Sequence, residues 1–150
     1  MSQSEYDALK LENQLCFPLY AAAREVVKRY RPYLDELDLT YTQYVTMMVM
    51  WEKREVTVKA LGEKLFLDSG TMTPVLKSLE AKGFVKRQRS AADERSVNVI
   101  LTDIGERLKA AAIEIPARIA ECVGLEPAEA AQLYVMLYKI LNTDKDENEG

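Results

Sequence analysis

The amino-acid sequence predicts a mainly helical protein that carries one small β-hairpin. Apolar residues recur at helical spacing along most of the 150 residues. The spacing changes only after Gly83, where FVKRQR and SVNVIL, residues 84–89 and 96–101, read as two short strands joined by the polar loop SAADER. The composition, 48% apolar and 29% charged, is ordinary for a globular chain, and the length suits a single domain over residues 1–150.

The N-terminal third contains two predicted helices. In the first, apolar positions repeat from Leu15 onward, and Pro32 is expected to end the helix at Arg31. The second, TQYVTMMVMWEK, can be capped by Thr40 or Thr42. Because this helix is apolar nearly all round, we expect it to lie at the centre of the core.

Two shorter helices follow. Thr57 caps the first, which runs to Phe66, and the second extends from about Thr71 to Lys82 before Gly83 ends it. Together with the hairpin, this pair is typical of a winged helix-turn-helix region over about residues 55–101.

The turn between the two short helices reads LDSG. Gly70 is expected to supply conformational freedom there, and either Asp68 or Ser69 can cap the second helix. Pro74 should fall in the first turn of that helix, where a missing backbone donor is tolerated.

After the hairpin, the sequence predicts a long helix and a final one. Asp103 and Glu106 form a capping-box-like start to the long helix, which Pro116 should bend. Gly124 closes it, and Pro127 begins the last helix.

A basic segment lies where a winged helix-turn-helix would meet DNA. Residues 82–89 carry four basic residues and no acidic one. An isolated basic run is usually a solvated surface, but its position directly after a capped helical pair favours binding to double-stranded operator DNA. Arg95, at the end of the loop, is a candidate to enter the minor groove. The other candidate contacts are Ser69, Thr71, Thr73 and Lys77 on the second short helix and Lys86, Arg87 and Arg89 on the hairpin.

The two ends of the chain carry more apolar surface than a wing domain of this size can cover. We therefore expect residues 10–35 and 103–142 to form a helical dimerisation region. A two-fold homodimer suits a palindromic operator whose half-sites are about 34–36 Å apart. The net charge of −4 does not contradict DNA binding, because residues 143–150 alone carry four acidic residues against one lysine.

Composition excludes several classes of function. Histidine is absent, which excludes His-based triads, the usual His-containing zinc sites and a His general base. Cys16 and Cys122 lie 106 positions apart, match no zinc or CxxC spacing and are expected to be free thiols in a reducing cytoplasm. No cofactor is expected. The chain has neither a signal peptide nor an apolar run of about 20 residues, so we expect no membrane association and a cytoplasmic location.

Three segments resemble a known family. LDSGTMTPVLKSLEAKGFVKRQRSAADERSV, residues 67–97, resembles the recognition helix and wing of the MarR family. With LENQLCF at residues 11–17 and LTYTQY at residues 39–44, the chain resembles the organic hydroperoxide resistance regulators within that family. The resemblance runs from Lys10 to about Leu141.

This resemblance implies a homodimeric repressor rather than an enzyme. Cys16 matches the cysteine that organic hydroperoxides oxidise, which releases the DNA, and Tyr30 and Tyr41 match the tyrosines that hydrogen-bond its thiolate. Asp93 and Arg95 match the wing-tip pair. Cys122 resembles the resolving cysteine of the two-cysteine subclass, in which a disulfide joins the subunits; in one-cysteine relatives a small thiol or further oxidation completes the reaction.

Two positions depart from the family pattern. Ser78 stands where a second basic residue is expected after Lys77, which could weaken operator binding there. Pro18 is less usual than a plain helix former. If the first helix begins near Leu15, Pro18 is its third residue and Cys16 its first, next to free backbone donors that favour a thiolate. If the helix instead runs through from Tyr6, Pro18 kinks it. We favour the first alternative.

Helix geometry adds one inference of its own. Fourteen residues of helix span about 21 Å, so a Tyr30 that reaches Cys16 must belong to the other subunit. A disulfide between Cys16 and Cys122 would need Cα atoms within about 7 Å, which a sequence cannot establish. Two other functions remain open: a repressor released by a small aromatic ligand, and a thiol peroxidase that uses Cys16.

Overall fold

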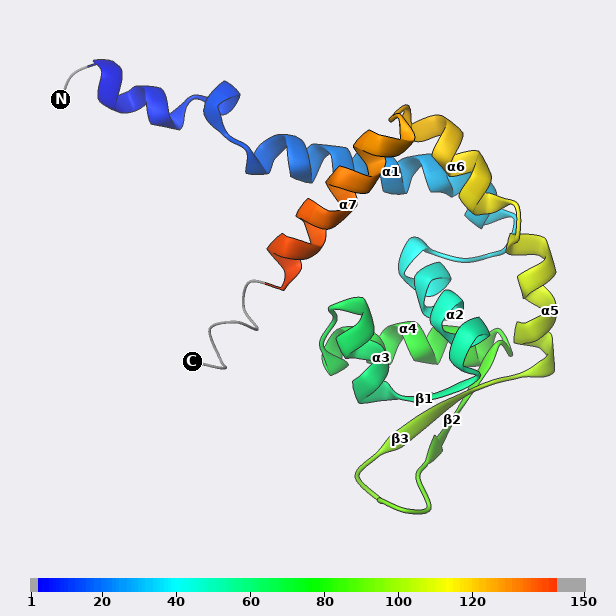
Figure 1. Ribbon diagram of the computed structural model, residues 1–150. Helices are drawn as coiled ribbons and strands as arrows, with labels where there is room; N and C mark the ends of the chain where they lie inside the picture. The colour runs from blue at the N-terminus through cyan, green and yellow to red at the C-terminus, as the bar shows by residue number, and fades with distance from the viewer. Residues whose placement is uncertain (1–2, 143–150) are drawn as a thin grey trace.

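The protein folds into seven α-helices and a small antiparallel sheet within residues 3–142, the part that the computed structural model describes (Figure 1). The predicted acidic tail, residues 143–150, lies outside this range. The elements in chain order are two 3-10 segments, Gln3–Leu9 and Leu11–Asn13, then α1 (Cys16–Asp35), α2 (Tyr41–Lys53), β1 (Glu55–Thr57), α3 (Val58–Leu65), α4 (Ser69–Ala81), β2 (Val85–Arg89), β3 (Val97–Leu101), α5 (Asp103–Ala112), α6 (Ile115–Val123) and α7 (Pro127–Leu141).

The mainly helical winged fold is confirmed, with a third strand that the sequence did not reveal. The sheet order is β1-β3-β2, both pairs antiparallel, and Val99 of the central strand pairs with Val56 on one side and Arg87 on the other. Strand β1 has only three residues between two helices, too few to show an alternating pattern.

Helix α2 lies at the centre of the core, as its apolar sequence predicted. Met47 and Met50 are fully buried against residues of α3, α4 and the sheet. Thr40, rather than Thr42, caps the helix: its hydroxyl accepts from the Gln43 N–H at 3.2 Å, and Gln43 Oε1 accepts from the Thr40 N–H at 3.0 Å.

Two predicted proline effects are wrong. Helix α1 continues through Pro32 to Asp35, because the missing N–H costs one hydrogen bond near the helix end while Leu34 is buried in the core. Pro116 does not bend one long helix. The chain instead breaks between Ala112 and Ile115 into α5 and α6, and Pro116 is the second residue of α6, where no helical donor is needed.

The start of α5 also differs from expectation, whereas the junction of α6 and α7 agrees with it. Thr102 rather than Asp103 caps α5, with its hydroxyl accepting from the Gly105 N–H at 3.1 Å. Gly124 ends α6 in the left-handed conformation, φ 74°, and Pro127 begins α7, as predicted.

The recognition helix α4 begins earlier than predicted. Asp68 is the cap and Ser69 the first residue, so Pro74 lies inside the helix at its sixth position rather than in its first turn. Gly70 is an ordinary helical residue; the left-handed residue of this turn is Phe66, φ 57°. The expected role of Gly70 as the flexible residue is therefore wrong.

The helices form two regions (Figure 1). Helices α2, α3 and α4 pack beside the sheet. Helices α1 and α6 lie side by side, α7 follows α6, and α5 connects the two regions. The α1, α6 and α7 region exposes large apolar side chains, including Leu15 at 80% and Val135 at 66% of full exposure. Within residues 3–142 no helix is long and apolar enough to cross a membrane.

Candidate functional site

An open groove of about 1150 Å³ lies between α3, α4 and the β2–β3 hairpin. It brings together Ser69 and Thr73 of α4 with Arg87, Asp93 and Arg95 of the hairpin. Of the other predicted DNA contacts, Thr71 and Lys77 are exposed on α4, and Lys86 and Arg89 are exposed on β2. The fold therefore gathers helix hydroxyls and wing cations on one region of the surface, the arrangement that phosphate and base contacts need.

Arg87 is held by Glu80 of α4, a residue that sequence reasoning missed. The Arg87 backbone N–H donates to Glu80 Oε2 at 2.8 Å, and its guanidinium Nη2 donates to Oε1 at 3.1 Å. These bonds from Arg87 hold the pKa of the Glu80 carboxyl below its usual range. With its side chain only 27% exposed, Arg87 joins the wing to the recognition helix more than it presents a free cation.

Asp93 shapes the tip of the wing. Its carboxylate accepts from the Arg95 N–H at 3.0 Å, and its backbone carbonyl accepts from the Ser96 N–H at 3.0 Å. Ser90 N–H closes the loop on the Ser96 carbonyl at 2.9 Å. The tip is thus held by Asp93 through backbone groups, which leaves the Arg95 side chain exposed.

Two predicted DNA-contacting residues of α4, Thr71 and Thr73, hydrogen-bond to neighbouring residues at the start of the same helix. Asp68 Oδ1 accepts from the Thr71 N–H at 2.7 Å, and the pKa of Asp68 is lowered by this bond and by the Thr71 side chain. The Thr73 hydroxyl donates to the Ser69 carbonyl at 2.8 Å. Ser69 and Lys77 are therefore the freer polar side chains on this face of the helix.

Three tyrosines form a cluster between α1 and α2. The ring centroids of Tyr30 and Tyr41 are 5.0 Å apart, and Tyr44, which sequence reasoning missed, lies 5.7 Å from Tyr30 and 6.3 Å from Tyr41. The spacing of three between Tyr41 and Tyr44 on one helix could have revealed it.

The environment of this cluster keeps its phenols protonated. Burial, together with Tyr41 and Tyr44, raises the pKa of Tyr30 to about 12, and burial raises the pKa of Tyr41 and Tyr44 as well. None of the three hydroxyls hydrogen-bonds to another residue within 3–142. At neutral pH the half-buried Tyr30 and Tyr41 keep protonated hydroxyls that can donate to an acceptor from outside the chain, whereas Tyr44 is buried.

Cys16 lies at the other end of α1. It is the first residue of the helix and Pro18 the third, so the helix starts at the cysteine, and Pro18 does not kink it. The favoured alternative for this segment is confirmed. The Cys16 side chain is exposed. Thirteen residues separate it from Arg29, about 20 Å along the helix.

Cys122 lies beside the tyrosine end of α1, not beside Cys16. It is an exposed residue near the end of α6, and its carbonyl accepts from Arg29 Nη1 at 2.5 Å. Tyr30 directly follows Arg29. One chain therefore brings the predicted partners of Cys16, the tyrosines and Cys122, to the same end of α1, far from their own Cys16.

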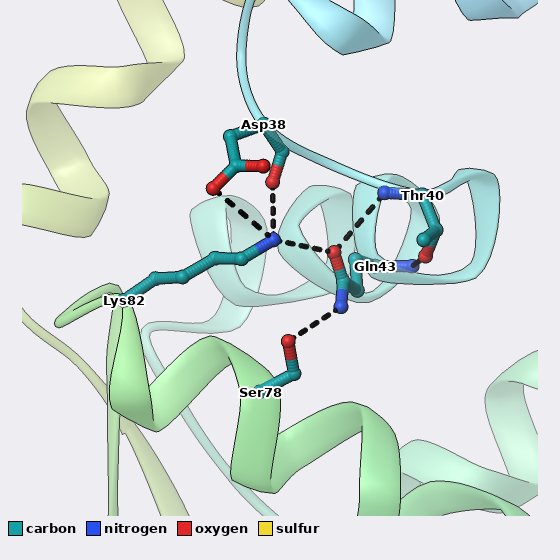
Figure 2. A network of polar contacts seen from close by, with 5 residues as sticks. All are labelled: Asp38, Thr40, Gln43, Ser78 and Lys82. Atoms are coloured by element: carbon teal, nitrogen blue, oxygen red, sulfur yellow. Dashed lines mark hydrogen bonds and ion pairs between the residues drawn. The ribbon is translucent and has the colours of Figure 1, made fainter.

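A buried polar network explains the departure at Ser78. Figure 2 shows Gln43 of α2 pointing toward α4, where its Nε2 donates to Ser78 Oγ at 2.9 Å. Ser78 thus faces α2 rather than the groove, and a long basic side chain there would displace Gln43. The serine is bonded to the buried Gln43 in this fold, and weaker operator binding at this position stays a prediction.

Comparison with known proteins agrees with this geometry. Residues 28–112 match the family described as transcriptional regulator SarA/Rot. The chain is 46% identical over 146 residues to the organic hydroperoxide resistance transcriptional regulator of Bacillus subtilis strain 168, covering 97% of this chain and 99% of that protein. It is 39% identical over 138 residues to the HTH-type transcriptional regulator SarZ of Staphylococcus saprophyticus, covering 92% and 94%.

One solved protein is similar in both sequence and structure. Overoxidized AbfR bound to DNA superposes with a TM-score of 0.76 at 34% identity, covering 92% of this chain and 97% of that one. AbfR, from Staphylococcus epidermidis, has also been solved with a disulfide formed, at a TM-score of 0.65, 33% identity and coverage of 94% and 99%. The relatives from Bacillus subtilis and Staphylococcus saprophyticus are transcriptional regulators, and AbfR has been solved bound to DNA.

Proposed function

The chain belongs to the MarR-like winged-helix transcriptional regulators, in their organic hydroperoxide resistance group, and we propose that it is a repressor that organic hydroperoxides release from DNA by oxidising Cys16. The observation that carries the proposal is the arrangement along α1. Cys16 begins the helix, whereas Tyr30, which packs against Tyr41, and Arg29, which binds the Cys122 carbonyl, lie about 20 Å further along it. A sensor of this kind is complete only when two chains supply opposite ends.

A homodimer with antiparallel α1 helices provides that arrangement. Two-fold symmetry would place Cys16 of one subunit against Tyr30 and Tyr41 of the partner subunit, in two equivalent sites. The exposed apolar side chains of α1 and α7, such as Phe17 and Val135, supply surface for the pairing. Protonated phenols then donate to the Cys16 thiolate and stabilise its charge, a role that histidine cannot fill in this chain.

The chemistry at Cys16 is a two-electron oxidation. The thiolate sulfur attacks one peroxide oxygen, the O–O bond breaks, and the remaining alkoxide takes a proton and leaves as an alcohol. The sulfur becomes a sulfenic acid. The Cys122 thiol of the partner subunit then attacks this sulfur, forms a disulfide and expels water. A thiol reductant restores both cysteines.

The disulfide is the step that separates the protein from DNA. Closing it pulls the start of α1 toward α6 of the partner subunit, and the α2–α4 region with its wing shifts in response. AbfR supports the distinction, because it has been solved bound to DNA in an overoxidized form and separately with a disulfide formed. In the reduced dimer, α4 enters the major groove and Arg95 the minor groove of an operator half-site.

The test of this function is an electrophoretic mobility shift with operator DNA taken from upstream of the gene. Cumene hydroperoxide is expected to release the DNA, and dithiothreitol is expected to restore the complex. Release that persists in dithiothreitol would point to a ligand-operated repressor instead. Repeated consumption of peroxide with a thiol reductant, at many turnovers per subunit, would point to a peroxidase.

A second measurement tests Cys122. On a non-reducing gel, peroxide-treated wild-type protein is expected to run as a covalent dimer, and Cys122→Ser as a monomer, because only the wild type can close the intersubunit disulfide. Both should run as monomers with dithiothreitol. A monomeric wild type after complete oxidation of Cys16 would contradict the two-cysteine mechanism and indicate a small thiol as the resolving partner.

A further inference from the structure

Five residues connect the turn between α1 and α2 to the end of the recognition helix: Asp38, Thr40, Gln43, Ser78 and Lys82 (Figure 2). We propose that this Gln43–Lys82 network carries the state of the tyrosine cluster to α4, with Gln43 and Lys82 as positioning residues for DNA binding. The inference rests on the proposed function, since it concerns how oxidation at Cys16 reaches the DNA-binding surface.

Gln43 is the hub of the network. It is only 6% exposed, yet both ends of its amide are bonded: Oε1 accepts from the Thr40 N–H at 3.0 Å and from Lys82 Nζ at 3.1 Å, while Nε2 donates to Ser78 Oγ at 2.9 Å. A buried amide that loses one hydrogen-bond partner costs free energy, because the unpaired group has no water to replace it. The residues bonded to Gln43 are therefore expected to move together. Gln43 thereby ties the first turn of α2 to α4 at two points.

Lys82 extends the network to the turn before α2. It caps the C-terminus of α4, and its Nζ donates to the Asp38 carbonyl and lies 3.7 Å from Asp38 Oδ2. Asp38 has φ 54°, the left-handed conformation that residues with a side chain rarely adopt. Lys82 binds both the backbone carbonyl and the carboxylate of Asp38 in this conformation. The end of α4 and the shape of the turn are therefore linked.

The tyrosine cluster lies on the two helices that this turn joins. Tyr30 is on α1, and Tyr41 and Tyr44 flank Gln43 on α2. When oxidation removes the thiolate acceptor from the tyrosine hydroxyls, the Tyr30 ring on α1 moves relative to the rings of Tyr41 and Tyr44 on α2. Apolar packing between α2 and α4 holds those helices together in either state. The network adds the contact through which the turn itself acts on α4.

The experiment compares Lys82→Met with Lys109→Met, which removes the same charge from an exposed position on α5. For each protein, operator affinity is measured in the reduced and the oxidised state, and Cys16 oxidation is followed by mass spectrometry. We expect Lys82→Met to oxidise at the wild-type rate but to lower the ratio of oxidised to reduced Kd by about tenfold. Lys109→Met should keep the wild-type ratio.

The outcomes separate the two proposals. A wild-type ratio in Lys82→Met, with Cys16 oxidised, overturns the network and leaves the peroxide sensor standing. Loss of affinity in both states by the same factor also overturns the network, because it indicates a structural role alone. A wild type that keeps its DNA after the disulfide between Cys16 and Cys122 has formed overturns both. Should Lys82→Met fail to fold, Ser78→Ala removes one bond of the network and is expected to lower the ratio by about threefold.

Discussion

Replacing Cys16 by serine is expected to abolish release by peroxide while leaving operator affinity within about twofold of wild type. Cys16 is exposed at the start of α1, far from the groove between α3, α4 and the wing, and such surface substitutions rarely shift free energies by more than about 0.5 kcal/mol. Serine keeps the size of the side chain, and its hydroxyl oxygen can still accept hydrogen bonds from the tyrosine hydroxyls, but it cannot be oxidised by a peroxide. Titrating operator DNA with and without cumene hydroperoxide measures both quantities.

Cys122→Ser is the matched control, because it makes the same change at the other exposed cysteine. It should still consume one equivalent of hydroperoxide per subunit, since Cys16 remains, whereas Cys16→Ser should consume none. If the Cys16→Ser protein is released by peroxide as readily as the wild type, Cys16 is not the sensor and the proposed mechanism fails.

Gly105→Ala is expected to be the most destabilising glycine-to-alanine change within residues 3–142. A Cβ at Gly105 would lie 2.2 Å from the Phe84 carbonyl oxygen and 2.8 Å from Leu101 Cδ1. The Phe84 carbonyl cannot easily retreat, because it accepts from the Thr102 N–H at 3.2 Å. The Gly105 carbonyl is held too, by Trp51 Nε1 at 2.9 Å. We expect the free energy of unfolding to fall by about 3 kcal/mol and the Tm to fall by about 6–12 °C.

Gly70→Ala tests whether this loss comes from the close approach or from the substitution itself. Gly70 is also helical, but a Cβ there would meet only Asp68 Oδ1, at 3.4 Å. Alanine should therefore be neutral or stabilise by up to about 1 kcal/mol. Thermal unfolding followed by circular dichroism, at one protein concentration because dimers unfold in a concentration-dependent way, compares the two. Equal Tm values for both variants would show that the contact with Phe84 does not limit stability.

Most helices could be predicted because their signals are local. Thr57 and the sequence after it mark the start of α3, and Gly124 and Pro127 mark the junction of α6 and α7. Predictions failed where packing outweighs a local preference. Burial of Leu34 carries α1 past Pro32, and the short strand β1 exists only because β3 pairs with it.

The candidate site also contains residues that could be predicted from the sequence and one contact that could not. Cys16, Tyr30 and Tyr41 could be named from their motifs, and helix geometry alone indicated that Tyr30 and Cys16 of one chain cannot meet. The hydrogen bonds and the ion pair between Arg87 and Glu80 could not be predicted. That contact depends on the angle at which the wing returns to α4, which no local pattern specifies.

By itself the sequence determined the class of protein and the helix end at which Cys16, the proposed sensor, lies, because motifs, caps and helical rise are properties of neighbouring residues. Only the tertiary structure decided that Arg29 of α1 contacts Cys122, and that Ser78 is hydrogen-bonded to Gln43. These pairings join residues 93 and 35 positions apart. Contacts over such separations are set by how helices pack, which depends on the whole core rather than on any one segment.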